Sequence, residues 1–133
     1  MSFIYLLIKN HANVNASDNN GETPIFYCSH KKHMDYLLKN GAEINILNNN
    51  KKGILRTTNK PTLNKYLIKN GAIPSTILIY KHYRDLFTKE QQDAFDSFLL
   101  LTNDDDQFFD MCLTYQNDQK NHVKIEIKDM DIL

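Results

Sequence analysis

Residues 36–45 have the sequence Tyr36-Leu37-Leu38-Lys39-Asn40-Gly41-Ala42-Glu43-Ile44-Asn45, and similar stretches occur on either side of it. The two similar stretches are Leu6-Leu7-Ile8-Lys9-Asn10-His11-Ala12-Asn13-Val14-Asn15 and Tyr66-Leu67-Ile68-Lys69-Asn70-Gly71-Ala72-Ile73-Pro74-Ser75. The three copies start 30 residues apart, and each contains Lys-Asn followed by Ala two positions later. A fixed period of this kind is typical of a repeat protein, whose units stack because none can bury its apolar face alone.

The residue types within the period predict the local structure of one unit. The apolar residues before each Lys-Asn pair predict a short helix with one buried face. Gly41 and Gly71 follow at the place where helices often end in left-handed backbone, and His11 occupies that place in the first copy at a higher cost. The polar run 18–22 predicts a turn, and Thr23-Pro24 then predicts the N-cap and first turn of a new helix. Each unit is therefore predicted to be a helix, a tight turn, a second helix and a hairpin.

This pattern resembles the ankyrin repeat over about residues 1–75, most clearly in residues 18–28 followed by 36–45. The resemblance implies an all-α fold, namely a short ankyrin-type helix-turn-helix solenoid. The period of 30 is shorter than the common ankyrin unit of about 33 residues, which predicts a trimmed helical turn. Leu55-Arg56-Thr57 replaces the usual Pro-Leu-His in the third copy. Because the chain starts at Met1, we expect the first repeat to be incomplete.

Residues 76–133 lack the repeat and are predicted to form an acidic helical C-terminal cap and tail. The apolar residues of 77–87 have helical spacing, and Thr88-Lys89-Glu90-Gln91 is a capping-box pattern that starts a further helix. The acidic run Asn103-Asp104-Asp105-Asp106 predicts the start of another. A degenerate fourth repeat, with residues 98–100 in the place of residues 66–68, is the alternative interpretation of this half.

The end of the chain changes character. Val123, Ile125 and Ile127 alternate with charged residues, and a period of two is typical of a strand. A single strand in a helical protein must find an edge or stay disordered. We therefore expect either a strand-like tail or loose packing in this segment.

Composition and charge exclude several classes of protein. The 133 residues carry 16 basic and 16 acidic side chains, but residues 1–75 have a net charge of +6 and residues 76–133 of −6. The two cysteines are far apart, which disfavours a disulfide framework and fits a reducing compartment. The short apolar run 3–8 suits neither a signal peptide nor a membrane span. These features predict a cytoplasmic protein, in the source cell or in a host.

No residue set predicts catalysis, a metal site or a cofactor. His30 and His33 have helical spacing for one metal but lack further ligands nearby. The run 104–106 lacks the Gly and Glu of a calcium loop and is better explained as a charged helix start. Cys28 falls at a small buried position of the ankyrin pattern, so we expect it to pack as a small hydrophobe and not to act as a nucleophile.

The resemblance implies a non-catalytic protein-interaction module that binds through its hairpin tips and a basic concave face. The partner-binding positions that it implies are Ser17, Asn19, Asn20, Glu22, Lys31, Leu47, Asn49, Asn50 and Lys52. With Lys32 and Lys51 nearby, this surface is expected to be basic and to suit an acidic protein partner. We expect no small-molecule substrate and no membrane binding.

Two alternatives remain open from the sequence. In the first alternative, the chain is a regulatory or inhibitory subunit, or a fragment of a larger protein, of the host-directed effector or toxin-neutralising type. Nucleic-acid binding by the basic half is disfavoured, because no base-reading motif is present.

Overall fold

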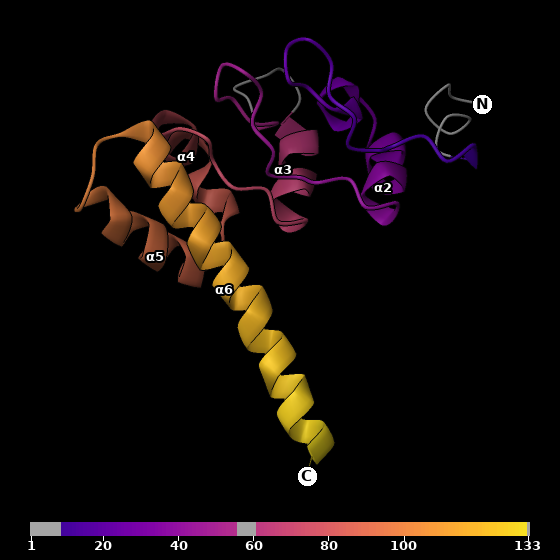
Figure 1. Ribbon diagram of the computed structural model, residues 1–133. Coiled ribbons are helices and arrows are strands. Elements are labelled where there is room, and N and C mark those ends of the chain that lie inside the picture. Colours follow the sequence, from indigo (N-terminus) through magenta and orange to yellow (C-terminus); the bar gives the residue numbers. More distant parts are fainter. Residues whose placement is uncertain (1–8, 56–60, 133) are drawn as a thin grey trace.

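The computed structural model describes residues 9–55 and 61–132, and the side chains of residues 9–55 and 62–120. Within these ranges the chain is helical and contains no strand, which confirms the predicted all-α fold. Two repeat units stack at one end, and the remaining helices follow beside them (Figure 1). The helix expected in the first copy lies over residues 1–8, outside the described residues.

The second helix of each unit forms as the sequence predicts. These helices are α2 (Lys31–Lys39) and α3 (Pro61–Lys69), which lie side by side in Figure 1. After them, Gly41 has a φ of +92° and Gly71 a φ of +100°. His11 adopts a φ of +67° at the equivalent place in the first copy, so the predicted left-handed positions are confirmed in all three.

The first helix of the unit is a single 3₁₀ turn, η1 (Pro24–Tyr27). Thr23 stands at its N-cap with extended backbone and Pro24 opens it, as predicted, but the Thr23 side chain makes no capping hydrogen bond. The Thr23 hydroxyl is buried and has no hydrogen-bond partner within the described part of the chain. A four-residue turn is consistent with the shortened repeat period.

The hairpin turns of the two units are built alike. Asp18 accepts hydrogen bonds through its carboxylate from the backbone N–H groups of Asn20 (2.9 Å) and Glu22 (3.0 Å). Thirty residues later, Asn48 uses its side-chain oxygen in the same way toward residues 50 and 52. Gly21 and its counterpart, Lys51, both adopt positive φ, at 75° and 60°. The local geometry is thus preserved where the residue types differ.

Asparagine side chains join each unit to the next. Asn15 donates to the carbonyl oxygen of Gly41 at 3.0 Å and accepts from the backbone N–H of Glu43 at 2.9 Å. Asn45 makes the equivalent pair with the carbonyl of Gly71 (2.8 Å) and the N–H of Ile73 (2.9 Å). Each bridge satisfies one donor and one acceptor of a loop that follows a helix. These two bridges set the position of each unit relative to the next.

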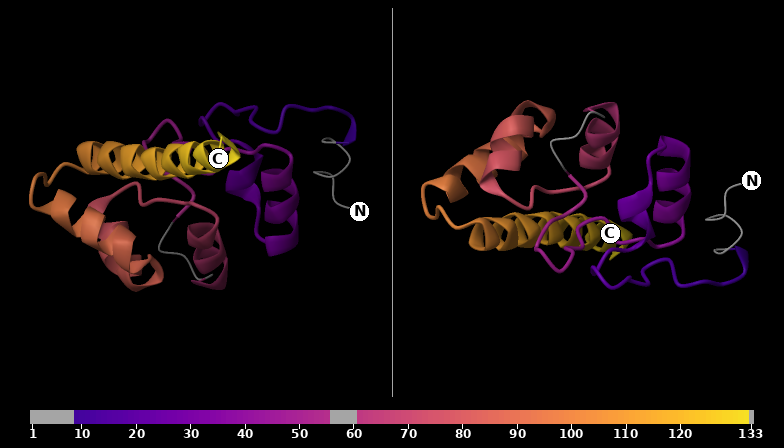
Figure 2. Two further views of the ribbon diagram at one scale, coloured as in Figure 1. Left: turned by 90° about the horizontal axis from the view of Figure 1, so that it is seen from below. Right: turned by 90° about the horizontal axis from the view of Figure 1, so that it is seen from above.

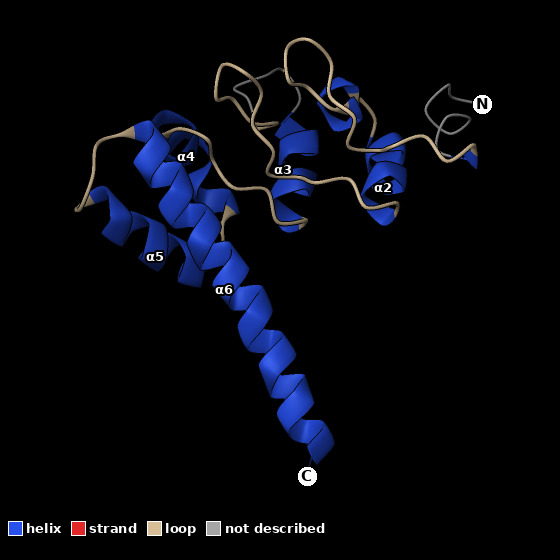
Figure 3. Cartoon of the chain, viewed as in Figure 1, coloured by secondary structure: helices blue, strands red, loops and turns tan. Residues whose placement is uncertain are grey.

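The C-terminal half is a set of packed helices. It comprises α4 (Ile77–Tyr83), the 3₁₀ turn η2 (Arg84–Leu86), α5 (Lys89–Leu99) and α6 (Asp105–Ile132). The predicted capping box is confirmed, since Thr88 and Gln91 bond each other's backbone N–H groups. Asp104 caps α6 by accepting from the N–H of Gln107 at 2.8 Å. Figure 3 shows the all-helical character of this half, and Figure 2 shows α6 alongside the other helices.

The predicted strand-like tail is wrong, because α6 continues as a helix to Ile132. A helix satisfies its backbone hydrogen bonds within the segment, whereas a strand needs a neighbouring edge. The described residues offer no such edge. Figure 1 shows α6 leaving the body of the protein, and its 28 residues correspond to roughly 40 Å of helix.

One continuous hydrophobic core runs through both halves. Tyr83 of α4 reaches the repeats, because its hydroxyl accepts a 2.7 Å hydrogen bond from the buried side chain of Asn64 on α3. Phe95 is fully buried, and its ring packs on those of Tyr80, Phe87, Phe98, Phe108 and Tyr115. The aromatic cluster thus holds the C-terminal helices together, while Tyr83 makes a direct bond to the last repeat.

Candidate protein-binding surface

A groove lies between the hairpin tips and the start of α4, and we call it the tip groove. Its volume is about 560 Å³. The residues that line it are Asn20, Glu22, Asn48, Asn50, Lys52, Leu55, Thr76, Leu78 and Ile79. One wall is polar and comes from both hairpins, and the other is largely apolar and comes from α4.

Hydrogen bonds between the two tips give the polar wall its shape. The backbone N–H of Asn49 donates to the carbonyl of Asn20, and the Asn49 side chain donates to the carbonyl of Asn19, each at 2.9 Å. The Asn48 amide also donates to the Glu22 carboxylate at 2.9 Å. A Cβ atom on Gly21, at a φ of +75°, would clash with the Asn49 side chain and lie 3.0 Å from the Asn49 backbone nitrogen, so this close approach favours glycine. The tips therefore form one connected surface.

A family model for the ankyrin repeat matches residues 20–49. Residues 20–49 are therefore similar to one ankyrin repeat. No curated protein and no solved structure shows significant similarity to the chain. Ankyrin repeats generally serve as protein-interaction modules, and the matched residues run from the first hairpin tip to the second. Of the helices in the described ranges, none is both long enough and apolar enough to cross a membrane.

The structure places the predicted binding positions in two groups. Asn20, Glu22, Asn50 and Lys52 line the tip groove. Ser17, Asn19, Asn49, Leu47 and Lys31 lie outside its lining. Leu47 is half-buried and packs against the hydrophobic core, and its role in partner binding stays a prediction.

The resemblance implies that Lys31 lies near the end of the first helix of its unit, and the structure places it elsewhere. Because η1 stops at Tyr27, Lys31 is instead the first residue of α2. Its Nζ lies 4.7 Å from the centre of the Tyr66 ring on α3. Its role in partner binding stays a prediction.

The charge near the groove is partly compensated within the chain. The Nζ of Lys51 lies 2.7 Å from a carboxylate oxygen of Asp106, at the start of α6. This hydrogen bond raises the pKa of Lys51, to which Asp104 and Asp110 add. The acidic half therefore folds back toward the basic tips, and Lys52 remains an exposed cation in the groove lining.

Two exposed apolar side chains flank the tips and were not singled out from the sequence. Leu78 is 72% exposed although it sits in an apolar run that predicted core packing. Tyr27 is 60% exposed, and its hydroxyl donates to the carboxylates of Asp18 and Glu22, which raises the Tyr27 pKa to about 12. The helical spacing of residues 77–83 contained the signal for Leu78, since Tyr80 and Tyr83 define the buried face.

Cys28, His30 and His33 were considered for catalysis or metal binding, and the structure shows the surroundings of each. Burial raises the pKa of the Cys28 thiol to about 11, so it is protonated and poorly nucleophilic at neutral pH. The rings of His30 and His33 lie 5.6 Å apart and nearly perpendicular. Within the described ranges, no three His, Cys, Asp or Glu side chains gather as a metal would require.

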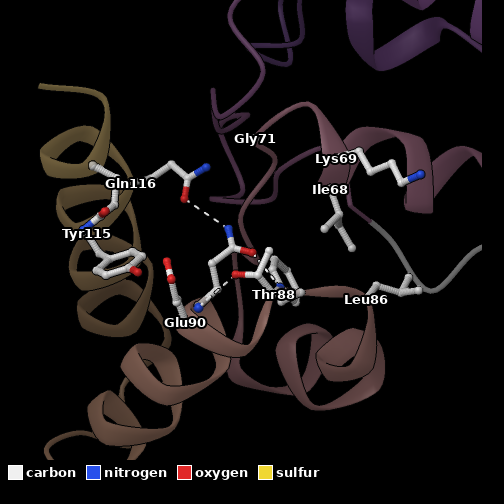
Figure 4. A pocket seen from close by; sticks show the side chains of 11 residues that line it. Ile68, Lys69, Gly71, Leu86, Thr88, Glu90, Tyr115 and Gln116 are labelled. Carbon is white, nitrogen blue, oxygen red and sulfur yellow. Dashed lines mark hydrogen bonds between the residues drawn. The ribbon is translucent and has the colours of Figure 1, made fainter. Parts of the chain in front are cut away.

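A second cleft, of about 490 Å³, marks the joint between the last repeat and the C-terminal helices (Figure 4). Ile68 and Gly71 line it from the repeat, and Thr88 and Gln116 from the C-terminal half. The side chain of Gln91 donates to that of Gln116 at 3.3 Å across the cleft. This bond joins α5 and α6, so it fixes the C-terminal side of the cleft.

Proposed function

We propose that the chain is a non-catalytic protein-interaction module whose partner binds in the tip groove. The observation that carries this proposal is the groove itself, which combines two hairpin tips with an exposed leucine on α4. Interfaces of this kind need apolar anchors at the centre and polar groups around them. Leu78 supplies the anchor, and the amide side chains of Asn20 and Asn50 supply donors and acceptors.

The scaffold supports the proposal because it holds the groove in shape before a partner arrives. The tips are bonded to each other through Asn49, and the units are bridged by Asn15 and Asn45. A preorganised surface loses less conformational entropy when it binds. A rigid backbone can present different side chains at the tips in fixed positions, which is consistent with a role of these side chains in recognition.

We further propose that the partner presents an acidic surface. Lys52 is an exposed cation in the groove lining, and Lys31 and Lys32 are exposed at the start of α2. Glu22, in contrast, is engaged by Asn48 and Tyr27. Rim charges of this kind mainly set the association rate and the specificity. A regulatory or inhibitory role would use the same surface, with the partner's activity as its readout.

The test is quantitative capture of partners from lysate of the source or a host cell, with the full chain as bait. Leu78→Asp with Lys52→Glu should lose the partner, whereas Lys65→Glu, which changes an exposed lysine on α3, should retain it. Partners retained equally by both variants would refute the tip groove. Capture of nucleic acid in place of protein, sensitive to Lys52→Glu, would favour the alternative class.

A further inference from the structure

A second groove lies on the C-terminal half and shares no lining residue with the tip groove. It has a volume of about 380 Å³, and we call it the α6 groove. On α6 it begins at Gln107 and continues at positions 3, 4, 7, 8 and 11 residues later, which is one face of a helix. Phe98 lines it from α5.

The floor of the α6 groove is apolar. Phe98, Met111 and Tyr115 are only half-buried, although Tyr115 packs on Phe95 with ring centres 5.7 Å apart. Methionine is unbranched and adapts its shape to an incoming surface. The floor therefore offers contact area that the chain itself does not cover completely.

Two exposed leucines follow Phe98 closely in the sequence, in the loop that leads into α6. Leu100 and Leu101 are 88% and 73% exposed in the loop between α5 and α6. The loop is tied to the groove, because Leu101 donates its N–H to the carbonyl of Phe98 at 2.9 Å. Thr102 likewise bonds Gln107, which lines the groove. A single exposed leucine is ordinary, but two beside an open apolar groove indicate an interaction surface.

Two acidic side chains line the groove. Asp110 and Asp118 both line it and both are exposed, and no lysine, arginine or histidine is among its described lining residues. They are two helical turns apart, a distance of about 12 Å along α6. A helix lying along α6 would meet both carboxylates with basic residues about seven or eight positions apart.

We propose that the α6 groove binds a basic amphipathic helix of a partner protein. The apolar face of that helix packs on Phe98, Met111 and Leu101, and its basic flank pairs with Asp110 and Asp118. The −6 charge of residues 76–133 attracts such a segment and disfavours an acidic one. This surface is independent of the tip groove, so one chain can join two partners of opposite charge.

The experiment measures binding of a fluorescein-labelled helical peptide of about 18 residues to the full chain by anisotropy. The peptide carries leucines at helix-spaced positions and lysines elsewhere, and its control is a scrambled peptide of identical composition. We expect the helical peptide to bind, and Asp110→Lys with Asp118→Lys to weaken it at least about tenfold through charge repulsion. Leu101→Asp should weaken it as well, and these exposed positions should leave the melting temperature almost unchanged.

The matched control is Leu78→Asp with Lys52→Glu, which alters the tip groove and should leave peptide binding intact. Equal binding of the scrambled peptide, or equal loss in the tip-groove variant, would overturn the α6 site. Concentration-dependent self-association in sedimentation that Asp110→Lys abolishes would show that a second copy is the occupant, which also overturns the proposal. Failure of either groove leaves the other testable, because each has its own variants and probe.

Discussion

Different kinds of contact stabilise the two halves of the chain. In the repeats, Asn15 and Asn45 bridge from side chain to backbone at the same relative positions. In the C-terminal half, an aromatic cluster surrounds Phe95, and Arg84 bonds the Asp96 carboxylate through its Nε at 3.0 Å. The repeat contacts are periodic and polar, whereas the C-terminal contacts are unique and mostly apolar.

This difference has a consequence for surface variation. A bridge that uses one asparagine and the backbone of the next unit places no demand on neighbouring side chains. The residues at the tips can therefore differ between units, as Asp18 and Asn48 do at equivalent positions. An aromatic cluster lacks this freedom, since each ring contacts several others.

The largest expected effect comes from separating the halves. A fragment of residues 1–75 should not unfold cooperatively, because Leu67, Ile68 and Ile73 belong to a core shared with the C-terminal helices. Circular dichroism and sedimentation of the fragment would test this. A soluble, monomeric fragment with a sharp thermal transition would show that the repeats are stable alone and that the second half is not a cap.

A smaller effect should distinguish the two asparagine bridges. Asn45→Ala leaves the N–H of Ile73, a residue only 4% exposed, without its acceptor, which typically costs about 1–3 kcal/mol. Asn15→Ala should cost less, because water can replace the bond to the exposed Glu43. Urea unfolding of both variants measures the difference, and equal losses would mean that burial does not set the strength of the bridge.

Backbone strain should make a substitution at Gly41 cost more stability than one at the nearby exposed Lys39. Gly41→Val places a β-branched residue at a φ of +92° and should cost at least about 1–2 kcal/mol, although nothing lies within 4 Å of its added Cβ. Lys39→Ala, at an exposed position, should stay within about 0.5 kcal/mol. Thermal melts compare the two, and similar shifts would place the repeat boundary elsewhere.

The smallest effect should appear at acid pH. Hydrogen bonds from Arg84 lower the pKa of Asp96, and Tyr80 adds a further bond. The stabilisation from Asp96 is therefore complete above its unfolded pKa of about 3.9 and is lost as pH falls through the lowered folded value. Solvent screening keeps the effect small, because the ion-pair side chains are 40% and 39% exposed.

The variant Asp96→Asn should therefore lose stability at neutral pH and show a smaller difference between neutral pH and about pH 3. Urea titrations at both values measure it. An unchanged acid dependence would assign the effect to other carboxylates, such as those of Asp18 and Asp35, whose pKa values are also lowered.

The sequence predicted the features that depend on local chemistry. The period, the left-handed positions after the helices and the capping box at Thr88 each follow from residue types a few positions apart. The recurrence of Asn15 and Asn45 was visible, but their bridging role depends on how units stack. Lys51 at positive φ and its bond to Asp106, 55 residues away, had no local signal. The helical tail was missed because a short run of alternating residues resembles a strand wherever it occurs.

Ser75 occupies the position that Asn15 and Asn45 hold in the earlier units. Its side chain lies against Gly53 within its own unit, and its hydroxyl is buried with no hydrogen-bond partner among the described residues. A serine is too short to reach across to a further loop as the asparagines do. The third unit therefore lacks the asparagine with which each earlier unit bonds the loop of the next unit. The bridge between units is thus absent where the repeats end and α4 begins.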